Sequence, residues 1–365
     1  MSHSSRGTYR SQGHRRASKA KVWFLGIVAV LVLGGIAYPV MDYLGVFSDQ
    51  GDPVSFGQPE PGEGGGQAGG DSGKQKKDSK VSFPTGPKAD FRVQSHLSDG
   101  TTIGVVKLHG KKSGFTGKVW VWAPKQYGEA KYAKSGFPVM IALPGGNGYP
   151  NNYWMGTDLK LQSTIAKESL EGKSLPFVLA MPVLNPDAKN YYDGSDIPGQ
   201  PKMGTWLTED VPDLMKANFR TLKSRDGWAF MGSSSGGFSG LKAVLKDPDK
   251  FKAVIASGPD IVPDSPLWAG HAAEKAANNP EKLAEKLIAA KHPDVYLAFQ
   301  VGTKEHTVMP KVQKFIAQYG NKGPVKTHLQ TIQGGEHNAK TYVQGMTNGS
   351  LQWISEHMEG PTPAS

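Results

Sequence analysis

Cysteine is absent from all 365 residues of the chain. This absence excludes disulfide bonds, cysteine-ligated metals and catalytic thiols, and it leaves the redox compartment open. The sequence also lacks an H-E-x-x-H motif, a zinc-spaced ligand pair and a Walker loop. Metalloprotease and nucleotide chemistry are therefore not expected.

Acidic residues are fewer than basic ones, with 32 Asp and Glu against 42 Lys and Arg and a formal net charge of +10. The first 21 positions hold no acidic residue and six basic ones: Arg6, Arg10, Arg15, Arg16, Lys19 and Lys21. Because much of the excess lies in this tail, the charge is not a footprint of nucleic-acid binding. We predict a basic cytoplasmic tail over residues 1–21 and no nucleic-acid partner.

A long uncharged run follows this tail, from Val22 to Met41. About 20 apolar residues in a helix span the hydrocarbon core of a bilayer. Retained basic flanks favour a cytoplasmic N-terminus. The run predicts a single-pass signal-anchor over residues 22–41, with the remaining chain outside the cell. The alternative is a cleaved signal peptide, with small residues at Gly35-Ile36-Ala37 before a mature N-terminus near Tyr38.

Residues 48–88 are rich in Gly, Pro, Gln and Ser and have few large apolar residues. Such a segment cannot bury enough surface to offset its conformational entropy. It predicts a flexible linker that holds a domain away from the membrane. A disordered segment without a spacing role fits the composition equally well.

Beyond residue 90, short apolar runs alternate with helical patterns, which predicts an α/β domain over residues 91–358 with a mainly parallel sheet flanked by helices. Phe91–Leu108 is expected to add an antiparallel edge. The other predicted strands are Lys118–Ala123, Val139–Leu143, Phe177–Met181, Ala229–Met231, Ala253–Ser257, Val295–Val301 and Thr327–Ile332. The predicted helices are Thr157–Leu170, Thr205–Leu222, Gly237–Leu245, His271–Ala290, Pro310–Tyr319 and Tyr342–His357.

Two insertions interrupt this alternation. Leu184–Gly204 is a long turn-rich loop, and such loops are often lids or walls of binding sites. Asp264–Ala290 has the composition of a helical cap over one end of the sheet. Either insertion can equally be plain surface structure.

The pentapeptide Gly-Ser-Ser-Ser-Gly at 232–236 directly follows the apolar run Trp228–Met231. A G-x-S-x-G motif between a strand and a helix is the nucleophile elbow of an α/β-hydrolase. Its sharp turn projects the central serine, Ser234, above the sheet, and the flanking glycines make room for the turn. Ser234 is the predicted nucleophile.

A serine hydroxyl needs a base, and in this fold the partners follow in the chain order serine, acid, histidine. His337 lies where the base is expected, between the last predicted strand and the last predicted helix. Three other histidines fit this position less well: His292, His328 and His357.

The predicted acid is Glu305, just after the strand Val295–Val301, because a carboxylate there can hold the imidazole in the productive tautomer. Asp260, after the preceding strand, is the alternative. The oxyanion is expected to bind the backbone N–H of Ser235 and an N–H of the glycine-rich loop 143–148. Gly146 is the predicted donor in that loop, and Asn147 is the alternative.

Several blocks of this sequence resemble the esterase D group, which includes S-formylglutathione hydrolase-like esterases and mycolyltransferases of the antigen-eighty-five type. The blocks are Val139–Gly148, Gly204–Pro212, Met231–Gly237, Gly302–Glu305 and Gly334–His337. The resemblance covers about residues 115–357. It implies an α/β-hydrolase fold, a Ser234–Glu305–His337 triad and no cofactor. The loop Gly145–Tyr149 lacks the arginine of the mycolyltransferases, which argues against mycolate transfer to trehalose.

The sequence thus predicts a membrane-anchored, extracytoplasmic serine esterase that forms an acyl-enzyme on Ser234 and requires no metal. Its predicted partners are a small-molecule, lipid or sugar ester and, through the N-terminal helix, the membrane. One alternative is an acyltransferase that passes the acyl group to a sugar or another alcohol. The other is a non-catalytic binding module on a hydrolase fold.

Overall fold

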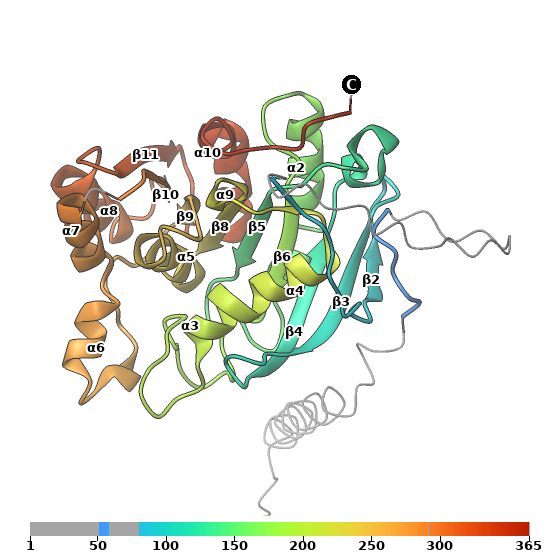
Figure 1. Cartoon of the computed structure of the whole chain (residues 1–365). Helices are drawn as coiled ribbons and strands as arrows, with labels where there is room; N and C mark the ends of the chain where they lie inside the picture. Colours follow the sequence, from blue (N-terminus) through green and yellow to red (C-terminus); the bar gives the residue numbers. More distant parts are fainter. Residues whose placement is uncertain (1–50, 58–79, 291, 365) are drawn as a thin grey trace, which may run out of the picture. The chain divides into compact units, whose positions relative to one another are not determined.

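The computed structural model describes residues 51–57, 80–290 and 292–364 (Figure 1). The predicted tail 1–21 and anchor 22–41 lie outside these residues. Within the described part, no helix is both long and apolar enough to span a bilayer.

The domain is built on a nine-stranded sheet with the order β11-β10-β9-β8-β5-β6-β4-β3-β2. The strands are β2 (Arg92–His96), β3 (Thr102–His109), β4 (Thr116–Trp122), β5 (Val139–Leu143), β6 (Val178–Pro182), β8 (Trp228–Ser233), β9 (Ala253–Ser257), β10 (Val295–Gly302) and β11 (Val325–Ile332). All neighbours from β11 to β6 pair in parallel, whereas β6, β4, β3 and β2 pair antiparallel. The predicted mainly parallel sheet with an antiparallel edge is confirmed.

The central strands are apolar along their whole length because both faces of the sheet are covered. Every residue of β5, β6 and β9 is buried. A strand that is buried on both faces reads as a continuous apolar run rather than as an alternating one. This is why the predicted strands Val139–Leu143 and Ala253–Ser257 coincide with β5 and β9.

Two predicted helices differ from the observed ones, one because of a proline and the other because its last residues pair in a strand. They are α2 (Leu161–Leu170), α3 (Met203–Thr205), α4 (Val211–Asn218), α5 (Ser235–Lys246), α6 (Ala272–Ala277), α7 (Pro280–Ala290), α8 (Val308–Tyr319), α9 (Ala339–Gly345) and α10 (Leu351–Ser355). The predicted helix His271–Ala290 is split at Pro280, because proline lacks the N–H that continues a helix. The predicted helix Thr205–Leu222 ends early because Thr221–Leu222 forms β7, which pairs with β1 (Val81–Ser82).

The predicted linker 48–88 is wrong for residues 51–57 and 80–88, which pack on the domain. Val54 N–H donates to the Phe91 carbonyl at 3.0 Å, so this segment extends the edge of the sheet beside β2. The Phe56 ring packs against Phe91 and Phe219, with ring centroids 5.3 and 5.1 Å apart. One aromatic ring and an unpaired strand edge thus order a segment that composition alone assigns to a linker.

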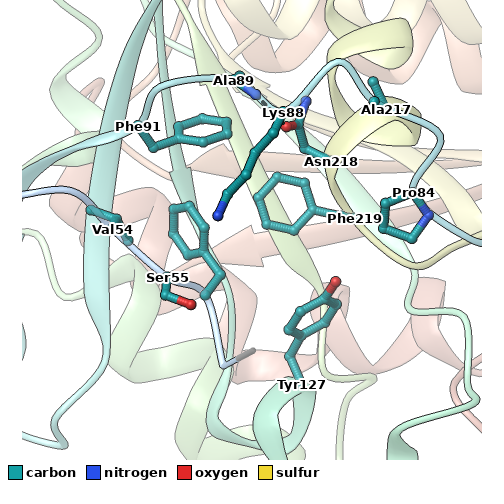
Figure 2. A pocket seen from close by; sticks show the side chains of 12 residues that line it. Val54, Ser55, Pro84, Lys88, Ala89, Phe91, Tyr127, Ala217, Asn218 and Phe219 are labelled. Carbon is teal, nitrogen blue, oxygen red and sulfur yellow. Dashed lines mark hydrogen bonds between the residues drawn. The ribbon is translucent and has the colours of Figure 1, made fainter. Parts of the chain in front are cut away.

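These segments form one wall of a pocket at the end of α4 (Figure 2). Figure 2 shows the Lys88 side chain extending between the rings of Phe91 and Phe219. Phe137, just before β5, donates its N–H to the carbonyl of Arg220 at 2.9 Å. Because Phe219 of the pocket directly precedes Arg220, the pocket lies near the amino end of β5.

Candidate active site

Ser234 occupies a sharp turn between the end of β8 and the start of α5. Its φ of 52° and ψ of −122° lie in a region that non-glycine residues rarely adopt. Backbone strain of this kind costs about 1–3 kcal/mol and persists only where the surrounding structure enforces it. Here the Ser234 N–H donates to the carbonyl of Ser257 at 2.8 Å, which fixes the turn against the end of β9.

The flanking glycines are required by direct contact. A Cβ on Gly232 would lie 2.5 Å from the backbone of Gly236. A Cβ on Gly236 would lie 2.4 Å from the carbonyl oxygen of Pro144. Side chains at these positions would push the turn away from β5, so the glycines set the height of Ser234 above the sheet.

Glu305 and His337 meet at the same edge, in the turns that follow β10 and β11. His337 Nδ1 lies 2.7 Å from Glu305 Oε1, and the Gly302 N–H donates to Glu305 Oε2 at 2.5 Å. Although burial acts to raise the pKa of Glu305, the hydrogen bonds from His337, Gly302 and Tyr342 lower it below its ordinary value. The hydrogen bond to Glu305 raises the pKa of His337, against the effect of burial. A carboxylate that accepts the Nδ1–H leaves Nε2 free to act as a base.

Asp260, the alternative acid, lies 3.6 Å from Lys311 Nζ. It influences His337 only through its negative charge, which helps to raise the pKa of His337. The geometry therefore favours Glu305 as the partner of His337.

Two of the alternative bases are engaged elsewhere: His328 stacks on Trp353, and His357 Nδ1 lies 2.7 Å from the Trp353 carbonyl oxygen.

Ser234 and His337 both lie against the turn formed by Ser257 and Gly258. Ser234 is hydrogen-bonded to Ser257, and a Cβ on Gly258 would lie 2.9 Å from His337 Nδ1. The contacts of residues 80–290 and 292–364 include no hydrogen bond between Ser234 Oγ and His337. Catalytic hydrogen bonds of this kind are often long in the free enzyme and tighten when substrate binds.

The two predicted oxyanion donors lie beside the serine. A Cβ on Gly145 would lie 3.2 Å from Ser234 Cβ, so the glycine-rich loop borders the elbow. Ser235 Oγ donates to the Gly146 carbonyl at 2.7 Å, which joins the loop to the start of α5. Among the residues that the structure describes, the N–H groups of Ser235 and Gly146 have no protein acceptor. They are thus free to bind an anionic oxygen.

Two tyrosines that were not among the predicted site residues support this arrangement. Tyr342 OH donates to Glu305 Oε1 at 2.7 Å and lies 2.9 Å from His337 Nδ1. Tyr153 OH accepts the Gly145 N–H at 2.7 Å and contacts Ser233 Oγ. Tyr153 lies in the stretch 149–156, which the sequence assigns to no helix or strand, and Tyr342 begins a predicted helix. No sequence signal places either hydroxyl at the site.

The described ranges contain no group of three or more His, Asp or Glu side chains arranged to hold a metal ion. The arrangement of a strained serine, a carboxylate-bound imidazole and two backbone N–H donors at one edge of the sheet supports nucleophilic chemistry.

A family model described as "Putative esterase" matches residues 117–355. The chain belongs to this family. The matched range contains the elbow, Glu305 and His337, and the predicted resemblance to esterases of the α/β-hydrolase superfamily is confirmed.

A curated relative is an uncharacterized protein of Corynebacterium glutamicum, 21% identical over 234 residues. That match covers 60% of this chain and 53% of the relative, so the chain spans about half the length of that relative.

Solved structures share the fold. A ferulic acid esterase superposes with a TM-score of 0.56 at 17% identity, over 71% of this chain and 99% of its own. An S-formylglutathione hydrolase from Agrobacterium tumefaciens gives 0.56 at 18% identity, over 73% and 99%. The α/β esterase fold is thereby confirmed.

Proposed function

We propose that this protein is a serine esterase that cleaves carboxylic esters through an acyl-enzyme on Ser234. The observation that carries the proposal is the 2.7 Å contact of Glu305 with His337 at the edge of the sheet where Ser234 is held in a strained turn. Membership of the esterase family supports the same reaction class.

In the first half of the reaction, His337 Nε2 accepts the proton of Ser234 as Oγ attacks the ester carbonyl. The negative oxygen of the tetrahedral intermediate binds the N–H groups of Ser235 and Gly146. Glu305 keeps the imidazole oriented and stabilises the imidazolium. The intermediate collapses, His337 returns the proton to the leaving alcohol, and the acyl group remains on Ser234.

In the second half, His337 Nε2 takes a proton from a water molecule that attacks the acyl carbonyl. The intermediate collapses, the bond to Oγ breaks, His337 returns the proton to Ser234 Oγ, and the carboxylic acid leaves. A sugar or another alcohol in place of water would make the same site an acyltransferase. The two outcomes differ only in the second nucleophile, so product analysis with glycerol or a sugar present separates them.

The test is turnover of a chromogenic acetate ester by wild type, Ser234→Ala and Ser239→Ala. Ser239 lies in the same helix and its Oγ donates to the Ser235 carbonyl at 2.8 Å, so it controls for loss of a serine near the site. We expect Ser234→Ala to lose about 10⁴-fold or more in kcat, and Ser239→Ala to retain most activity. A folded Ser234→Ala protein with wild-type turnover would refute Ser234 as the nucleophile. A folded wild-type protein without turnover would leave the non-catalytic binding module.

We also propose that residues 22–41 anchor the protein, with residues 1–21 in the cytoplasm and the catalytic domain outside the cell. The uncharged run and its basic flank support this topology. Protease added to intact cells should remove the domain and leave a membrane-bound N-terminal fragment. A soluble mature protein that begins near Tyr38 would show a cleaved signal peptide instead.

A further inference from the structure

Lys242 is a charged residue buried in the middle of α5, with 3% of its surface exposed. Its ammonium donates to three acceptors in the loop Leu184–Gly204: the carbonyls of Asp193 and Gly194 at 2.6 and 2.5 Å, and Ser195 Oγ at 2.5 Å. Burial lowers the pKa of Lys242 to about 7, against the attraction of the Asp193 carboxylate. All three ammonium protons have partners, so the lysine holds the loop on the helix that begins next to Ser234.

Asp193 fixes the same part of the loop from its other side. Its backbone is left-handed, with a φ of 52°. Its carboxylate accepts the Trp268 Nε1–H at 2.6 Å and the Ser265 N–H at 3.3 Å, so the predicted cap region also contacts the loop. A left-handed non-glycine residue that is buried and hydrogen-bonded from two segments indicates a rigid wall rather than a mobile lid.

The other end of this loop braces the oxyanion loop. Asn185 Nδ2 donates to the Asn147 carbonyl at 2.6 Å, and Asn147 Nδ2 donates to the Ala188 carbonyl at 2.7 Å. The Leu184 N–H donates to the Gly148 carbonyl at 3.0 Å. These three bonds hold the segment that follows Gly146.

The oxyanion loop is therefore tied to α5 in two ways. The short connection is the bond from Ser235 Oγ to the Gly146 carbonyl. The long connection runs from Asn147 to Asn185, whose Oδ1 accepts the Tyr192 N–H at 3.0 Å, and from the adjoining residues 193–195 to Lys242. Because the oxyanion hole needs one N–H from each of these two elements, their spacing sets how well it fits the transition state.

We propose that Lys242 is a positioning residue: through the loop Leu184–Gly204 it holds the Gly146 N–H at its working distance from the Ser235 N–H. This inference rests on the proposed esterase activity. A positioning group acts on the transition state more than on the bound ester, so its loss lowers kcat and leaves KM nearly unchanged.

The test is a double-mutant cycle on kcat with Lys242→Met and Asn185→Ala, which break the long connection at its two ends. We expect each single variant to lose about 10-fold in kcat, less than the 10²–10³-fold loss of a whole oxyanion donor. The double variant should lose little more kcat than either single variant, because each substitution alone already breaks the same connection. Lys246→Met, whose Nζ bonds Asn278 Oδ1 at 3.0 Å, is the matched control and should keep wild-type kcat.

Two results would overturn the inference: kcat losses that multiply in the double variant, or a Lys242→Met protein that behaves as Lys246→Met. If Lys242→Met does not fold, Ser195→Ala replaces it in the cycle, since it removes one of the three acceptors and keeps the lysine. Ser234→Ala tests the esterase activity separately, because its total loss of turnover does not depend on the loop.

Discussion

At the carboxyl ends of the parallel strands the chain places strained backbone and buried polar groups, whereas near their amino ends it places packed aromatic rings. The φ angles of Ser234 and Asp193 are positive, and Glu305 is 5% exposed yet charged. Around the pocket of Figure 2, by contrast, the Phe56 ring meets Phe91 edge to face and Phe219 at a tilt. Strain at Ser234 and the buried charge of Glu305 both reduce stability, which indicates that this edge is the functional one.

Among substitutions that compare the two ends of the sheet, the largest loss of kcat is expected when the Glu305 carboxylate is replaced. Glu305→Gln should lower kcat by about 10³–10⁴-fold, because the amide cannot stabilise the imidazolium and favours the wrong tautomer. Asp260→Asn should change kcat by less than about threefold, since it influences His337 only through its charge. Steady-state kinetics on a chromogenic ester decide between the two, and the reverse order would make Asp260 the acid.

A smaller loss is expected from Gly258→Ala, whose added Cβ would lie 2.0 Å from Tyr342 OH and 2.6 Å from Glu305 Oε1. Displacement of this pair should lower kcat by about 10²-fold, the scale of a misplacement near 1 Å. Gly334→Ala is the matched control, because its φ of 67° carries the same backbone strain and its Cβ meets nothing within 4 Å. Equal losses in both variants would show that backbone strain alone is responsible.

The pH profile should show a smaller effect at the same edge. His337 must be neutral to accept a proton, and its pKa is raised, so kcat/KM should fall as pH decreases through a midpoint above 6.5. Tyr342→Phe removes a hydrogen-bond donor from Glu305, so the carboxylate stabilises the imidazolium of His337 more strongly. The midpoint should therefore move to higher pH. Tyr319→Phe, which loses a bond to Glu285 on α7, should leave the profile unchanged.

The smallest effect on catalysis is expected at the aromatic end. Phe56→Ala should reduce the free energy of unfolding by about 1–2 kcal/mol, because the ring is half-buried, and leave kcat/KM unchanged. Leu170→Ala, at a side chain that is 70% exposed, should change stability by less than about 0.5 kcal/mol. Chemical denaturation measures both changes in the free energy of unfolding. A loss of kcat/KM in Phe56→Ala would show that the aromatic end also contributes to catalysis, which would contradict the separation of the two regions.

The sequence predicts well those features that depend on local pattern. The apolar runs of β5 and β9 identify the central sheet, and chain order alone brings Ser234, Glu305 and His337 under consideration. Their catalytic roles stay predictions. Features that depend on tertiary contact are not visible in the sequence: the packing of Phe56 on the sheet edge, the bond of Tyr342 to Glu305, and the bonds of the buried Lys242 to the loop Leu184–Gly204.

The most direct test of the central claim is the mapping of a fluorophosphonate adduct by peptide mass spectrometry on the folded protein. The account predicts a single adduct on Ser234 in wild type, and labelling slowed by orders of magnitude in a folded His337→Ala variant. An adduct on another serine, or equally fast labelling of Ser234 without His337, would contradict it.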